Sequence, residues 1–194
     1  MVARFRRPRR GAGIQANLDQ GEAAMLIQLC RELSDLWAVA EEGPDEASAE
    51  GDGADGGGAE RGRARDPVLD RLFPRAYLDP TEEESEAEWQ RFARPDLVEG
   101  RKETVEIFLR TLAGAKQHRS GLEVMLSAEE AGVWLAVIND SRLALGTRLE
   151  VTEDTHPANF KPGDPAAAPF AVYWWLGYLE EHLVDTLASG MDSQ

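Results

Sequence analysis

The segment from Ser127 to Leu149 is an almost wholly apolar run with helical spacing, and it constrains the fold more than any other part of the chain. Ser127 followed three residues later by Glu130 is a capping-box pattern that predicts a helix start, and Gly146 predicts the helix end. Apolar residues cover more than one face of this helix, which is typical of a central position. The sequence therefore predicts a fold built around this segment.

Three polar residues interrupt the central helix: Asn139, Asp140 and Arg142. A buried polar group without a partner costs about 1 to 3 kcal/mol, so each side chain has to be satisfied. These groups are either hydrogen-bonded within the core or presented to another molecule, and the sequence leaves both alternatives open. Asn139, Asp140 and Arg142 are accordingly one set of candidate partner-binding residues.

Apolar residues at steps of three and four predict further helices before and after the central one. Pro67 follows a capping Asp66, Thr81 to Glu84 forms a second capping box, and Pro95 is expected to open a helix that runs to about His118. The first and last predicted helices cover residues 19–40 and about 169–188. The predicted fold class is mainly α, a bundle of about five helices.

The N-terminal segment differs from the rest of the chain. Residues 4–7 and 14–18, separated by a proline and glycines, predict a short N-terminal β-hairpin. We therefore divide the chain into a basic arm or hairpin, residues 1–18, and a single helical domain, residues 19–194. Residues 41–65 interrupt that domain with an acidic, glycine-rich insertion, which we expect to be disordered because it lacks the apolar residues needed to offset the entropy of ordering.

Charge separates the arm from the body. The chain has 194 residues and a formal net charge of −15, yet its first 13 residues contain no acid and five arginines: Arg4, Arg6, Arg7, Arg9 and Arg10. The arm is either a solvated tail or hairpin edge, or it docks on an acidic partner or on DNA. Arg4, Arg6 and Arg7 are therefore candidate partner-binding residues, and the acidic run from Asp79 to Glu88 is either a solvated face or a site for a basic partner.

Composition excludes several classes of protein. The large negative charge makes general adhesion to nucleic acid unfavourable, so direct binding to nucleic acid is not expected. No apolar run reaches the roughly 18 residues of a membrane span, and the N-terminus lacks the apolar stretch of a secretion signal, so we expect a cytoplasmic protein. Cys30 is the single cysteine and lies on an apolar helix stripe, which predicts a buried thiol and excludes an intramolecular disulfide or a cysteine-rich zinc site.

Motifs for catalysis are absent from the sequence. It contains no glycine-framed nucleophilic serine, no phosphate-binding loop and no dinucleotide fingerprint. His182 and Asp185 have a spacing that could place two metal ligands on one helix face, but no second histidine of a zinc motif accompanies them. We therefore expect neither an enzyme nor a cofactor or metal site. Paired carboxylates acting in a helical bundle are the remaining enzymatic alternative.

Three blocks of the sequence resemble an actinobacterial family of oxidative-stress transcriptional regulators, the AosR-like family, long catalogued as a domain of unknown function. They are DPVLDRLFPRAYLDP (residues 66–80), EWQRFARPDLVEGRK (residues 88–102) and WLAVINDSRLALGTRL (residues 134–149). The resemblance covers nearly the whole chain outside the 41–65 insertion.

The resemblance implies control of cysteine-synthesis and redox-defence genes by contact with an alternative sigma factor or RNA polymerase. It also implies a redox switch made by two nearby cysteines, from which this chain departs because Cys30 stands alone. The alternative function is a non-catalytic adaptor or assembly protein with no role in transcription. A homo-oligomer is compatible with either function.

Overall fold

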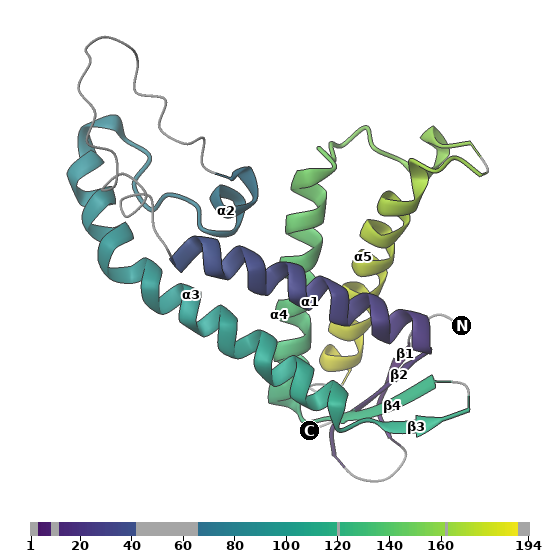
Figure 1. Ribbon diagram of the computed structural model, residues 1–194. Coiled ribbons are helices and arrows are strands. Elements are labelled where there is room, and N and C mark those ends of the chain that lie inside the picture. The colour runs from purple at the N-terminus through teal and green to yellow at the C-terminus, as the bar shows by residue number, and fades with distance from the viewer. Residues whose placement is uncertain (1–3, 9–11, 42–65, 120, 162, 190–194) are drawn as a thin grey trace, which may run out of the picture.

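The computed structural model describes residues 4–8, 12–41, 66–119, 121–161 and 163–189. Within these residues the fold is mainly α, as the sequence predicts, with a four-stranded sheet at one end (Figure 1). The helices are α1 (Gln20–Glu41), α2 (Pro67–Leu72), α3 (Glu83–Ala113), α4 (Ala128–Arg148) and α5 (Ala167–Ala188). The strands are β1 (Arg4–Arg6), β2 (Ile14–Leu18), β3 (Lys116–His118) and β4 (Gly121–Leu126).

The helices cross around one core. In Figure 1, α4 and α5 run side by side, α1 crosses them, and the long α3 extends past α1 at one end. Trp37 of α1, Phe108 of α3 and Trp134 of α4 are fully buried where these helices meet. Cys30 has no exposed surface, which confirms the prediction of a buried thiol. No helix of the described residues is both long enough and apolar enough to cross a membrane.

The predicted N-terminal hairpin is present as β1 and β2, which pair antiparallel with Phe5 opposite Ala16. The sheet continues beyond it in the order β1-β2-β4-β3, with Ala16 of β2 opposite Val124 of β4. The prediction of a helix running to His118 is wrong, because α3 ends at Ala113 and the chain turns into β3. From Glu123 to Leu126 strand β4 alternates more exposed and buried side chains, and the extended backbone thereby turns Val124 and Leu126 toward the helices.

Helix α3 is one continuous helix of 31 residues with Pro95 inside it, so the prediction that Pro95 opens a helix is wrong. Proline removes a backbone donor, but Pro95 is exposed and water can satisfy the carbonyl that loses its partner. The predicted Thr81 to Glu84 capping box is also wrong. Asp79 instead caps a single 3-10 turn, Pro80–Glu82, and accepts a hydrogen bond from the Thr81 amide at 2.9 Å.

Helix α4 begins as predicted. The Ser127 Oγ accepts from the Glu130 amide at 3.1 Å, and the Glu130 carboxylate accepts from the Ser127 amide at 2.7 Å. The prediction that Gly146 ends this helix is wrong, because α4 continues to Arg148. The left-handed backbone conformation that often follows a helix end is found at Glu150, with a φ of 50°. A Cβ on Gly146 would lie 2.9 Å from the Tyr173 ring, so this glycine allows close packing of α5.

The remaining predictions concern the segments between helices. Residues 150–161 and 163–166, between α4 and α5, form a loop with one 3-10 turn, Pro157–Asn159. Asp66 caps α2 with Pro67 in its first turn, as predicted. Of the predicted insertion at residues 41–65, only Glu41, the last residue of α1, is described; residues 42–65 lie outside the described residues.

Candidate functional site

The candidate residues of the central helix point to different neighbours. Asp140 is buried and forms an ion pair with Arg101 of α3. Burial raises the pKa of the Asp140 carboxyl, while the hydrogen bond and positive charge of Arg101 oppose that rise. Asn139 is half-buried. Asp140 is therefore an internal tie in this structure.

Arg101 is a residue that the sequence reasoning missed. Besides its ion pair with Asp140 it donates to the Leu72 carbonyl at 3.2 Å, and its guanidinium lies 5.5 Å from the Trp37 ring and 5.1 Å from the Phe73 ring. It thereby joins α1, α3 and α4 to the end of α2. A signal was available, because Arg101 occupies the same helical stripe as the buried residues Val98, Val105, Phe108 and Leu112.

Arg142 joins α4 to α5. Its Nη1 lies 3.1 Å from Glu180 Oε2, and its guanidinium lies 5.2 Å from the Tyr173 ring centre. The guanidinium passes close to Gly177, since a Cβ there would lie 3.4 Å from Arg142 Nε, at van der Waals contact. These contacts fit the internal alternative for Asp140 and Arg142, and partner binding by Asn139, Asp140 and Arg142 stays a prediction.

The basic arm is anchored to the last helix. Arg7 donates from Nε to the Thr186 carbonyl at 3.3 Å and from Nη2 to the Leu187 carbonyl at 3.4 Å, at the C-terminal end of α5 where a positive charge is favourable. Phe5 is buried against Trp134, with the ring centres 6.2 Å apart. Arg6 is exposed, and Arg4 pairs with Asn17 in the sheet. Arg9 and Arg10 lie outside the described residues.

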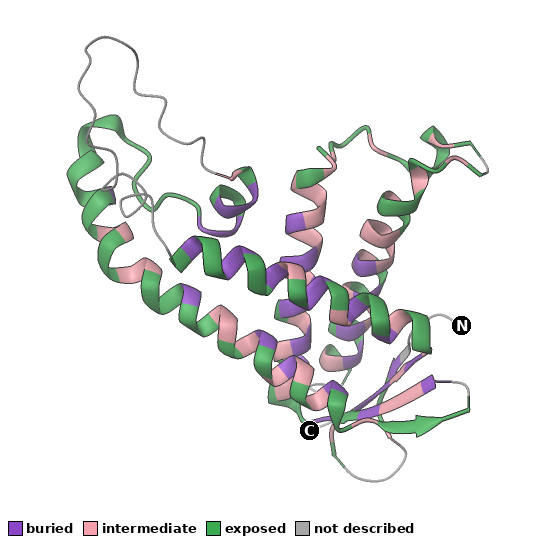
Figure 2. Cartoon of the chain, viewed as in Figure 1, coloured by how far each residue is buried: buried purple, intermediate pink, exposed green. Residues whose placement is uncertain are grey.

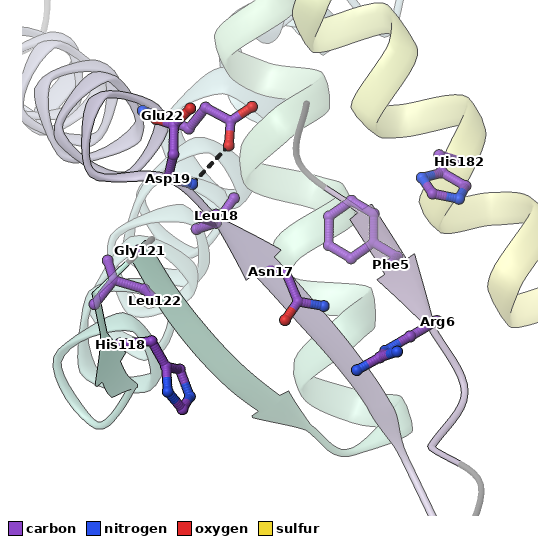
Figure 3. A pocket seen from close by; sticks show the side chains of 10 residues that line it. All are labelled: Phe5, Arg6, Asn17, Leu18, Asp19, Glu22, His118, Gly121, Leu122 and His182. Atoms are coloured by element: carbon purple, nitrogen blue, oxygen red, sulfur yellow. Dashed lines mark hydrogen bonds between the residues drawn. The ribbon is translucent and has the colours of Figure 1, made fainter. Parts of the chain in front are cut away.

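A hollow of about 340 Å³ lies where the sheet meets the start of α1 and the C-terminal part of α5 (Figure 3). Three strands contribute one lining side chain each: Arg6, Asn17 and His118. Helix α5 contributes His182, whose Nδ1 is buried without a hydrogen-bond partner. The two acids of the hollow cap α1 reciprocally, because the Glu22 amide donates to Asp19 at 2.9 Å and the Asp19 amide donates to Glu22 at 2.8 Å. That backbone hydrogen bond from Glu22 lowers the pKa of Asp19.

A second surface comprises residues 77–99, that is, the first half of α3 with the loop and 3-10 turn before it; we call it the acidic end of α3. Figure 2 shows that this half of the helix is largely exposed. Two large apolar side chains are unusually open there, Leu78 with 82% and Phe92 with 63% of its surface exposed. By helical spacing Phe92 lies one turn from Glu88 and one turn from Asp96, and the Arg91 guanidinium lies 5.3 Å from the centre of its ring. Exposed apolar groups rimmed by polar ones are typical of protein-binding surfaces.

The acidic end is held in a fixed shape by its own hydrogen bonds. Glu86 is buried and accepts from the Ala76 and Tyr77 amides, both at 2.9 Å. Arg75 pairs with Glu83 at 2.5 Å and so joins the same loop to the first turn of α3. The loop that carries Leu78 is therefore fastened to the helix that carries Phe92.

Two further observations concern metal ligands and the thiol. Among the described residues, no group of three histidine, cysteine, aspartate or glutamate side chains gathers in a way that could hold a metal ion. Burial raises the pKa of the Cys30 thiol to about 12, so the thiol stays protonated near neutral pH.

Comparison with known proteins identifies the family to which the chain belongs. The family model described as "Domain of unknown function (DUF2017)" matches residues 2–187, and the chain belongs to this family. Two curated relatives carry the name "Oxidative stress regulator AosR", one from Mycobacterium tuberculosis and one from Mycobacterium bovis. Each is 30% identical to this chain, and the match covers 95% of this chain and 87% of the relative. The predicted membership of the AosR-like family is confirmed.

A further relative, from Mycobacterium leprae, is 32% identical over 63% of this chain and 58% of its own length. The names of these relatives support a regulatory role in oxidative stress for this chain. No solved structure matches the chain significantly.

Proposed function

We propose that this chain is a non-enzymatic regulator of transcription in oxidative stress, which works in the cytoplasm by contacting an alternative sigma factor or another part of RNA polymerase. The observation that carries the proposal is similarity to the oxidative stress regulators over 95% of the chain. The genes that it controls would include those for cysteine synthesis.

The acidic end of α3 supplies a suitable contact surface. A polymerase component that binds DNA presents basic side chains to phosphates, so it meets a carboxylate-rich helix favourably. Charge steers such an encounter, whereas a buried aromatic anchor provides most of the affinity. Phe92, exposed between Glu88 and Asp96, is placed to be that anchor.

Regulation by this chain does not use a cysteine switch in our proposal. Cys30 is the single cysteine, so no disulfide can form within the chain. Its thiol is buried and protonated, which makes a chain-to-chain disulfide unfavourable as well. Cys30→Ala should therefore leave the response to an oxidant intact in cells.

The test is a binding assay with purified sigma factors and core polymerase of the source organism. Phe92→Ala should weaken binding at least about tenfold, as expected for an interface anchor, and Glu88→Lys should slow association. Val184→Ala, which truncates an exposed apolar side chain on α5, is the matched control and should change nothing.

The outcomes separate the alternatives. Unchanged binding by Phe92→Ala would move the contact away from the acidic end of α3. Failure of every polymerase component to bind, together with unchanged cysteine-synthesis transcripts in a deletion strain under oxidant, would refute the regulator proposal. Recovery of a non-transcriptional partner, such as a protease adaptor, would favour the adaptor function.

A further inference from the structure

A second hollow lies over the C-terminal half of α4, where α2 and α5 pack against that helix. In Figure 1, α4 lies between these two neighbours. The hollow, which we call the α4 hollow, has a volume of about 410 Å³, within the range of roughly 300 to 1,000 Å³ that small-molecule sites occupy. It is lined by Arg142 of the central helix but by no residue of the acidic end of α3. It is therefore separate from the surface proposed to contact RNA polymerase.

The floor of the α4 hollow is mainly apolar. Leu143 and Gly146 lie on one face of α4, and Val151 follows the end of that helix. Two carbonyls of the last helical turn already accept hydrogen bonds, since the Val151 amide donates to Gly146 at 2.9 Å and the Glu150 amide donates to Thr147 at 3.2 Å. These satisfied carbonyls repel an anion less than free ones would.

Two arginines bring positive charge to the α4 hollow. Arg71 comes from the last turn of α2 and Arg142 from α4, and none of the described residues that line the hollow is acidic. Arg71 is exposed and has no hydrogen bond or ion pair within the part of the chain that the structure describes. Glu180, the partner of Arg142, lies on α5 and does not line the hollow. One positive charge is therefore left unbalanced, in a chain whose net charge is −15.

Arg142 is held in place beside the hollow. Its Nη1 donates to Glu180 at 3.1 Å, and its Nη2 donates to the Tyr173 hydroxyl at 3.5 Å. Its Nε is buried near Gly177 without a hydrogen-bond partner. A guanidinium has five N–H groups, so two of them remain for a ligand. The Tyr173 hydroxyl donates to no described residue, and its proton is available as well.

We propose that the α4 hollow binds a small organic anion. The phosphate or carboxylate group of this ligand contacts Arg71, Arg142 and the Tyr173 hydroxyl, and its apolar part lies against Leu143 and Val151. Guanidinium groups recognise both kinds of anion through parallel hydrogen bonds. Because Arg142 is already fixed by Glu180, less side-chain entropy is lost when the ligand binds.

The experiment is isothermal titration calorimetry of the full-length chain with phenyl phosphate, which joins a phosphate group to an apolar ring. Arg71→Gln removes a positive charge but no contact of the fold, so it should weaken binding about tenfold, as expected for a lost hydrogen bond between charged groups. Arg31→Gln is the matched control, because Arg31 is an exposed arginine on α1 that does not line the hollow. It should leave the affinity unchanged.

Tyr173→Phe tests the second donor. The phenyl ring keeps the contact with the Arg142 guanidinium, and only the hydroxyl is removed. Binding of phenyl phosphate should weaken several-fold while the melting temperature stays close to that of wild type. Arg142 itself is left intact in these variants, because its replacement would also disturb the link between α4 and α5.

Two further probes identify the anionic group. Tighter binding of phenyl phosphate than of benzoate would assign the α4 hollow to a phosphorylated ligand, and the reverse order would assign it to a carboxylate. Benzyl alcohol, which has the ring but no charge, should bind far more weakly than either anion.

Four results would refute the proposal. The first is that neither phenyl phosphate nor benzoate binds saturably, and the second is that Arg31→Gln weakens binding as much as Arg71→Gln does. The third is that benzyl alcohol binds as tightly as the anions. The fourth is that inorganic phosphate binds as tightly as phenyl phosphate, which would leave no role for the apolar floor. None of these results bears on binding to RNA polymerase, which is measured separately with Phe92→Ala.

Discussion

Replacement of Arg101 should measure how much the buried ion pair with Asp140 contributes to the unfolding free energy. Arg101→Met keeps the length of the side chain but leaves the Asp140 carboxylate, 10% exposed, without its cation. Breaking a fully buried pair costs about 3 to 5 kcal/mol, and since the Arg101 side chain is 30% exposed we expect a value near the lower limit. Loss of the hydrogen bond to Leu72 and of the contacts with Trp37 acts in the same direction. The expected loss is about 3 kcal/mol of unfolding free energy.

The assay is chemical denaturation of wild type, Arg101→Met and the double variant Arg101→Met/Asp140→Leu. The double variant should recover to within about 1 kcal/mol of wild type, because an apolar pair of similar size replaces the ion pair. A single variant as stable as wild type, or a double variant no better than the single one, would refute the assignment of Asp140 and Arg101 as a coupled pair.

The pH dependence of the same variant follows from the raised pKa of Asp140. Because the folded state holds the Asp140 proton more tightly than the unfolded chain does, the stability that this group contributes is present at acid pH and is lost as pH rises through the raised pKa. Without Arg101 the pKa should rise further. Arg101→Met should therefore lower the unfolding free energy, relative to wild type, by less at about pH 4.5 than at about pH 7.5. An equal cost at both pH values would contradict the electrostatic explanation.

Three other predictions address packing and surface. Cys30 should react slowly with iodoacetamide in the native protein and quickly in denaturant, and equal rates would show that its thiol is accessible. Gly146→Ala should cost about 1 to 3 kcal/mol because its Cβ would meet the Tyr173 ring; Gly132→Ala in the same helix meets nothing within 4 Å and should stabilise by about 1 kcal/mol, as thermal melts can check. Asn139→Leu should lower the melting temperature if Asn139 is an internal tie, whereas loss of partner binding with an intact melting curve would make it a docking residue.

Features with local causes could be predicted from the sequence. The capping box at Ser127 and the cap at Asp66 depend on residues within one helical turn, so their residue types predict the observed hydrogen bonds. The buried position of Cys30 follows from its place on the apolar stripe of α1. Pairing of residues 4–6 with residues 14–18 needs only a short turn, and it too was predictable.

Features that depend on distant partners could not be predicted in this way. Residues 121–126 form strand β4 because β2, about a hundred residues earlier in the chain, offers a hydrogen-bonding edge, and β3 then pairs with β4. Gly146 carries a helix-ending residue type, yet α4 continues to Arg148, and this glycine instead lies where Tyr173 of α5 packs closely. Arg101 stood on a core stripe of α3, but its carboxylate partner, 39 residues away, was not evident from spacing alone.

The sequence alone determined the helical class, the principal helix starts and the negative charge of the body, because these depend on residue type and short-range spacing. Only the tertiary structure decided that Asp140 and Arg142 lie against Arg101 and Glu180, and that residues 14–18 and 121–126 pair as neighbouring strands. The physical reason is that an ion pair or a strand pair is formed by two parts of the chain. Each part can specify its own conformation, but neither can specify where the other will lie.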